Sequence, residues 1–131
     1  MSSPESDSIL PIVWPSIKDV YKFVLVEIRN ENYLKFRETY NEFHGEILGR
    51  LLDEFNIEYE TFRHSKIDCP TAKKEGEYHA IAMGSIGVYP DKKSASIISS
   101  SISGAYPSYP ANDNAIEILR NMAPEWNFKI I

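Results

Sequence analysis

Two side chains of this sequence stand where they could do chemistry, a histidine and a lysine. His44 follows Tyr40 by four residues and precedes Leu48 by four, at the edge of an apolar helical stripe. One ring nitrogen can face a cleft from such a position, which suits a catalytic group; a structural histidine packed between helix and sheet fits as well. Lys22 interrupts an apolar run, where a lysine needs either an anion or an exit to solvent at the strand end.

Other chemical motifs do not stand out. His64 and His79 show no spacing typical of a metal site, so we interpret them as structural, and Cys69 is the only cysteine. The sequence lacks a glycine-rich phosphate loop, a dinucleotide-binding fingerprint and a Ser-His-Asp pattern. Its 19 acidic residues offer no pair that can be singled out for glycoside hydrolysis. We therefore expect neither a metal nor a cofactor.

The element that must position His44 is a long helix, which we predict from Tyr33 to Phe55. Apolar residues recur along it every three or four positions, at Phe36, Tyr40, Phe43, Ile47 and Leu51. Asn56 is suited to a left-handed cap after its last turn. A second, shorter helix is predicted from Asn114 to Met122, because Asn112 or Asp113 can cap it and Ile116, Leu119 and Met122 are spaced to face inward; Pro124 ends it.

The element that must position Lys22 is a strand. The run 20–28 is almost continuously apolar, which is typical of a central strand buried on both faces. Further segments with strand character are 57–65, 78–89, 94–103 and 126–130. Residues 66–77 are predicted to form a loop. The turn residues at 90–93 favour an antiparallel hairpin between the strands 78–89 and 94–103.

The predicted order is therefore strand, helix, three strands, helix, strand. This order indicates an α/β (α+β) fold in which a mixed β-sheet is packed with two α-helices. A length of 131 residues fits one domain. We assign residues 1–15 to an N-terminal tail and an extended, proline-broken lead-in, and residues 16–131 to the single domain.

Charge and composition limit the partners. The formal net charge is −5 and the basic residues are scattered, which argues against nucleic acid or an anionic membrane as a partner. We find no run of eighteen apolar residues and no signal peptide. With one cysteine, an intramolecular disulfide is impossible and a reducing compartment is favoured. We expect a cytoplasmic monomer.

Three segments, in their order along the chain, resemble the phosphohistidine phosphatase (Janus/Ocnus) family. Residues 21–28, Tyr-Lys-Phe-Val-Leu-Val-Glu-Ile, are similar to the family's first strand, Phe-Lys-Tyr-Val-Leu-Ile-x-Val. Residues 42–47, Glu-Phe-His-Gly-Glu-Ile, are similar to its helix sequence Glu-Tyr-His-Ala-Asp-Ile. Residues 103–106, Ser-Gly-Ala-Tyr, are similar to its Ser, variable residue, Ala or Gly, and aromatic. The similarity spans most of the chain at low identity, as in a divergent member.

The resemblance implies a metal-independent protein phosphohistidine phosphatase whose substrate is a phosphorylated protein or peptide. In that case His44 would act as general base or nucleophile on the phosphoryl group. Lys22 would hold the phosphoryl oxygens as a point charge and keep the imidazole neutral by like-charge repulsion. The hydroxyl of Ser103, with the backbone N–H groups of Gly104 and Ala105, would complete the anion site.

The sequence departs from the family's pattern in one segment. The family has Gly-Gly-Gly-Arg-Ile where residues 82–87 read Ala-Met-Gly-Ser-Ile-Gly, without an arginine. Arg63 could supply that guanidinium, although a solvated strand arginine is the simpler interpretation. Another placement would put the phosphate loop at residues 85–87, but the position just before the second helix favours residues 103–105. The missing arginine supports the alternative function, a non-catalytic phosphate- or protein-binding domain on the same fold.

Overall fold

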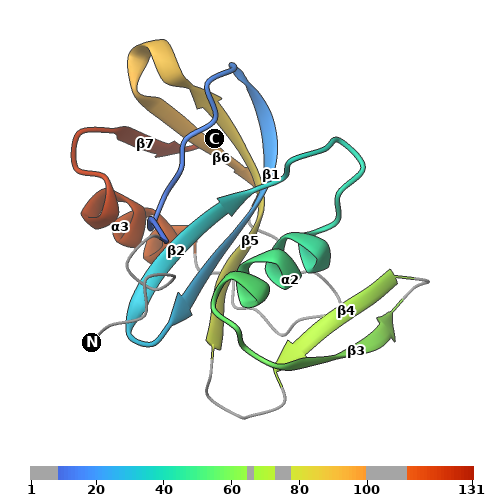
Figure 1. Cartoon of the computed structure of the whole chain (residues 1–131). Coiled ribbons are helices and arrows are strands. Elements are labelled where there is room, and N and C mark those ends of the chain that lie inside the picture. Colours follow the sequence, from blue (N-terminus) through green and yellow to red (C-terminus); the bar gives the residue numbers. More distant parts are fainter. Residues whose placement is uncertain (1–8, 65–66, 73–77, 100–111) are drawn as a thin grey trace.

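A computed structural model of the protein describes residues 9–64, 67–72, 78–99 and 112–131 (Figure 1). The elements in these ranges are β1 (Asp19–Ile28), β2 (Glu31–Phe36), α2 (His44–Glu54), β3 (Tyr59–His64), β4 (Ile67–Ala72), β5 (Tyr78–Tyr89), the short 3-10 helix η1 (Pro90–Lys92), β6 (Ser94–Ser99), α3 (Asn112–Met122) and β7 (Asn127–Ile130).

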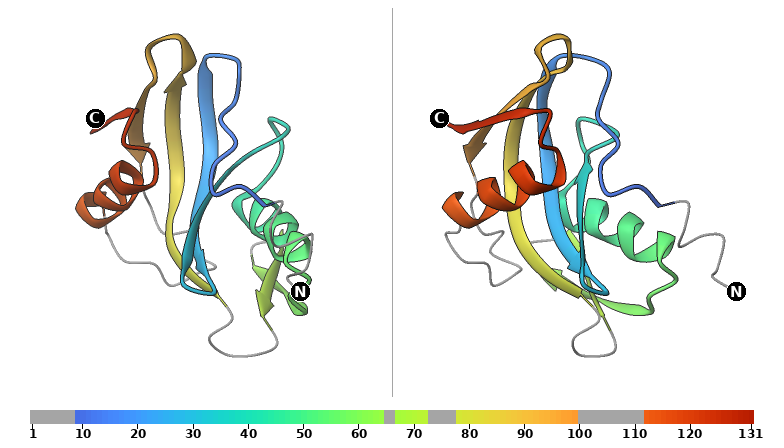
Figure 2. Two further views of the ribbon diagram at one scale, coloured as in Figure 1. Left: turned by 60° about the vertical axis from the view of Figure 1, so that its left-hand side comes forward. Right: turned by 90° about the vertical axis from the view of Figure 1, so that its left-hand side faces the viewer.

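Five strands form the main sheet in the order β2-β1-β5-β6-β7. The β6–β7 pair is parallel and the other three pairs are antiparallel. β3 and β4 form a separate antiparallel hairpin. Helix α2 lies on one face of the main sheet and α3 on the opposite face (Figure 2). The predicted fold class, a mixed sheet packed with two helices, is confirmed.

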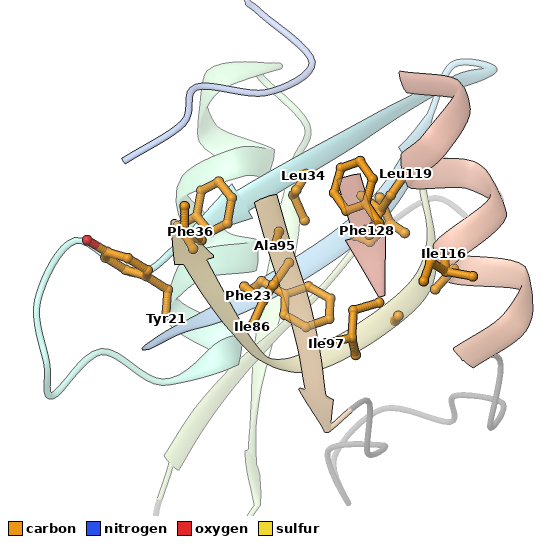
Figure 3. Close-up of a cluster of buried hydrophobic side chains, with 14 of the residues drawn as sticks. Tyr21, Phe23, Leu34, Phe36, Ile86, Ala95, Ile97, Ile116, Leu119 and Phe128 are labelled. Carbon is orange, nitrogen blue, oxygen red and sulfur yellow. The ribbon is translucent and has the colours of Figure 1, made fainter. Parts of the chain in front are cut away.

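The central strand β1 supplies side chains to a hydrophobic core on each side of the sheet. Val24, Val26 and Ile28 join the core under α2, whereas Phe23 and Leu25 face the core under α3. Figure 3 shows part of the second core, where side chains from β1, β2, β5, β6, β7 and α3 meet. The prediction of a central strand buried on both faces is therefore confirmed, because apolar residues at both odd and even positions have a helix to pack against.

The predicted helix from Tyr33 to Phe55 is wrong in its first half. Residues 31–36 form β2, which pairs with β1 in antiparallel register, and the helix begins only at His44. Tyr33 packs in the α2-side core, while Leu34 and Phe36 pack in the α3-side core. This alternation has a period of two, as in a strand. Because the residues on both faces are apolar, the alternation cannot be recognised in the sequence.

Other predictions are confirmed in part. Residues 78–89 and 94–99 form the antiparallel hairpin β5–β6, and residues 100–103 of the predicted strand lie outside the described residues. Asn56 has a φ of 55°, as expected for the left-handed cap. Part of the predicted 66–77 loop is instead β4, which contains Pro70. A two-stranded hairpin consists of edge strands, where a proline need not donate to a ladder.

The lead-in before β1 packs against the sheet. The carbonyl of Pro11 accepts a hydrogen bond from the Leu34 backbone N–H at 2.8 Å. Trp14 stacks on Trp126, with ring centres 3.7 Å apart. None of the helices in the described part of the chain has the length and apolar character needed to span a bilayer.

Candidate active site

Lys22 projects from β1 on the face that carries α2, two positions before Val24 of the core. Its side chain is half-buried, and its Nζ donates a hydrogen bond to the backbone carbonyl of Glu42 at 2.9 Å. The same Nζ lies 5.1 Å from the centre of the Phe43 ring. Among the described residues this carbonyl is the one hydrogen-bond acceptor of the ammonium, which has three N–H groups. The lysine is therefore held in a fixed place with donor capacity to spare.

His44 is the first residue of α2, and its half-buried ring reaches the neighbouring strand β5. The helix starts here because Phe43 is extended and its backbone N–H donates to the Glu46 carboxylate at 3.0 Å. The imidazole Nε2 lies 2.9 Å from the carbonyl oxygen of Gly84. A carbonyl oxygen can only accept, so Nε2 carries a proton and donates it. In the neutral ring the lone pair is then on Nδ1.

The surroundings of His44 favour that neutral ring. Burial is the largest effect and lowers the pKa of the imidazole, and the positive charge of Lys22 lowers the pKa further. The hydrogen bond to Gly84 acts in the opposite direction but is outweighed. The position at the start of a helix adds to the effect, because the N-terminal end of the helix dipole disfavours a cation. The ring is therefore an uncharged base at neutral pH.

Strand register places Lys22 and the carbonyl that binds His44 at neighbouring positions along the strands. Lys22 pairs with Ser85 across β1 and β5, and Phe23 pairs with Gly84, the partner of His44. On its other side Ser85 pairs with Ser99, the last residue of β6. The β5–β6 register shifts next to this pair, so that β6 has an extra residue at Ile98. The lysine, the histidine and the end of β6 thus belong to one neighbourhood.

The predicted site residues fare differently in the structure. Lys22 and His44 are close enough that the charge of one shifts the pKa of the other. Ser103, Gly104 and Ala105 lie outside the described residues. Arg63 is in β3, and its backbone pairs with that of Asp68 of β4 in the separate hairpin. The side chain of Arg63 is not among those described.

Two groups of this neighbourhood were missed by sequence reasoning. The Glu42 and Gly84 backbone carbonyls hold Lys22 and His44, and a backbone acceptor leaves no mark in a sequence. For Gly84 a weak signal existed, because a glycine inside a strand often marks a close approach of another chain segment. The alternative placement of the phosphate loop at residues 85–87 points to this part of the sheet, since Ser85 pairs with Lys22.

Within the described ranges, no three side chains of His, Cys, Asp or Glu are grouped so that they could hold a metal ion. The chain matches no protein-family model, and no curated protein matches it.

Proposed function

We propose that the protein is a metal-independent protein phosphohistidine phosphatase, a hydrolase of P–N bonds in which His44 acts on the phosphoryl group. One arrangement carries this proposal: the His44 ring, whose Nε2 is bound to the Gly84 carbonyl and whose pKa is lowered by burial and by Lys22, lies close to the ammonium that Glu42 holds. A base or nucleophile next to a fixed cation is the minimum that phosphoryl transfer needs. The similarity of residues 21–28 and 42–47 to the phosphatase family supports the same function.

The P–N bond of phosphohistidine is weak, so one nucleophile or general base is enough to start the reaction. If His44 is the nucleophile, its Nδ1 lone pair forms a bond to phosphorus and the P–N bond to the substrate breaks. The bond's electron pair goes to the leaving imidazole, which takes a proton from solvent. Water then hydrolyses the phosphorylated His44 to release phosphate. If His44 is a general base, Nδ1 instead takes the proton of a water molecule that attacks phosphorus directly.

In both routes Lys22 has the same role. Its ammonium would contact the phosphoryl oxygens with the N–H groups that Glu42 does not use and would balance their charge. We further propose that Ser103, Gly104 and Ala105 supply more donors, because they follow β6, whose last residue is level with Lys22. The substrate is a phosphorylated protein or peptide, and the single cysteine favours a cytoplasmic setting.

The test is phosphate release from a phosphohistidine peptide by three variants. His44→Ala should lose about 100- to 10,000-fold in turnover, the usual contribution of a positioned base. His44→Gln keeps an amide N–H that can donate to Gly84 but has no basic lone pair, so it should be as inactive while folding like the wild type. His79→Ala is the matched control, because His79 is an exposed histidine on β5. Wild-type turnover in His44→Gln would refute the proposal.

The alternative is a non-catalytic phosphate- or protein-binding domain. One observation favours it: Ser85 is the residue that pairs with Lys22 across β1 and β5. Ser85 lies in the segment 82–87, where the similar family has its arginine. Binding of inorganic phosphate that depends on Lys22, without any release of phosphate from the peptide, would select this function over the enzyme.

A further inference from the structure

The residue that holds Lys22 is itself held by an arginine on α2. Arg50 donates from Nε to Glu42 Oε2 at 2.7 Å and from Nη2 to Glu42 Oε1 at 2.9 Å. This is the two-pronged geometry in which a guanidinium binds a carboxylate most specifically. The Glu42 side chain is only 10% exposed and that of Arg50 28%, so the pair is largely shielded from water.

The same guanidinium also binds other residues of the connection between β2 and α2. Arg50 also donates to the Glu38 carboxylate at 2.8 Å and to the backbone carbonyl of Phe36 at 3.0 Å. The backbone N–H of Glu38 in turn donates to Glu42 Oε1 at 2.8 Å. Residues 37–43 are therefore fixed at both ends, because one side chain binds the last residue of β2 and the residue two positions before the helix.

Glu42 joins this network to the candidate site through its two ends. Its carboxylate is bound by Arg50, and its backbone carbonyl accepts the hydrogen bond from Lys22. We propose that Arg50 and Glu42 are positioning residues, which hold the Lys22 ammonium beside His44 without touching the phosphoryl group themselves. The consequence for turnover depends on the function proposed above, whereas the coupling between Arg50 and His44 does not.

The physical reason is that an unheld lysine side chain is flexible and turns its ammonium to water. If Glu42 shifts, Lys22 loses its acceptor, and its charge then acts more weakly on the imidazole.

The described groups that face His44 and Lys22 come from β5 and from the chain that leads into α2. β5 presents the uncharged Gly84 and Ser85. The segment before the helix presents the Glu42 backbone carbonyl and the Phe43 ring to Lys22. Lys22 is the charged group that lowers the His44 pKa, while the carboxylates of Glu42 and Glu46 are bound by Arg50 and by the Phe43 N–H. A loss of the Arg50–Glu42 pair should therefore reach His44 mainly through Lys22.

The experiment compares Arg50→Lys and Glu42→Gln with a control at the other end of α2. Arg50→Lys keeps the charge but loses the fork, and Glu42→Gln keeps the shape of the side chain but loses its charge. The control is Glu54→Gln, which breaks the ion pair between Glu54 and Lys35, 2.9 Å long, that also ties α2 to the sheet. For each protein the His44 pKa is titrated by NMR, and kcat and KM are measured on a phosphohistidine peptide.

We expect the His44 pKa to rise in both test variants, with a loss of roughly 10-fold in kcat, and neither change in Glu54→Gln. If Arg50→Lys does not fold, Glu42→Gln decides, because it removes only one charge from the network. A folded test variant with an unchanged His44 pKa would overturn the positioning role. If the wild type releases no phosphate, the proposed function fails, yet the pKa comparison still tests the link from Arg50 to His44.

Discussion

Two halves of one sheet face differ sharply, although the same strands build both. In the half under α2, β1 presents Val24 and Val26 and β5 presents Met83, and all three are buried. In the other half the same strands present Val20, Lys22 and Ser85, which are exposed or half-buried. Because side chains alternate with a period of two, these residues all point to the same side of the sheet.

The boundary between the halves is the first residue of α2. His44 is where the helix that covers the apolar half begins, and its ring donates to the backbone of β5 beside Lys22. The covered half stabilises the fold, because it removes apolar surface from water. The uncovered half keeps a cation and a base in place with hydrogen bonds to backbone carbonyls. Among the described residues, the start of the helix is thus where a buried ring with a lowered pKa lies next to a cation held by a backbone carbonyl.

The largest effect that separates the halves should come from Leu51→Ala. Leu51 is fully buried in the α2-side core, so we expect a loss of about 2–5 kcal/mol in the free energy of unfolding. Val20→Ala, in the uncovered half of the same sheet face, should cost less than about 1 kcal/mol, because Val20 is exposed. Urea denaturation measures both. Equal losses in the two variants would show that the halves do not differ in this way.

The elements of this sheet face were only partly predictable. The run 20–28 revealed β1, because a strand buried on both faces is continuously apolar. The same property concealed β2, where Tyr33 and Leu34 pack on opposite faces and the spacing of Phe36 with later aromatic residues imitates a helix. Pairing with β1 along residues 31–36 decides the structure, and such long-range contacts override local propensity.

The candidate site was predictable in its side chains but not in what holds them. A lysine within an apolar run and a histidine beside a helical stripe are visible as local irregularities. The acceptors of both are backbone carbonyls far away in sequence, at Glu42 and Gly84, and depend on how strand register and helix start combine. Arg50 could not be singled out either, because an arginine on a helix surface is ordinary until its partners are known.

A smaller effect, on activity rather than stability, is expected from Lys22→Met. Methionine keeps the unbranched apolar stem, so the stability change should be about 1 kcal/mol, the value of one hydrogen bond. Turnover of a phosphohistidine peptide should fall about 100-fold, as when one charge-stabilising donor is removed from an active site. The His44 pKa should rise as well.

Lys18→Met provides the control for that variant. Lys18 lies just before the same strand and its Nζ is 5.3 Å from the ring centre of Tyr89, so it has a comparable aromatic contact away from His44. The control should keep full turnover and an unchanged His44 pKa. If Lys22→Met also kept both, the uncovered half would have no chemical role for its cation.

The smallest expected effect is on the pH dependence of stability, and it concerns His44, the residue at the boundary between the two halves. The pKa of His44 is lowered in the folded protein, so between pH 6.5, near its unfolded value, and the lower folded value the unfolded chain binds more protons. The stability that the neutral ring contributes is thus present above pH 6.5 and is lost as the pH falls through the folded pKa. His44→Gln removes this titration but keeps a donor for Gly84. Urea denaturation at pH 7.5 and pH 5 should therefore show a smaller acid-side loss in the variant than in the wild type. An equal loss would mean that the ring is not held neutral, and the proton acceptor at the end of α2 would then be absent.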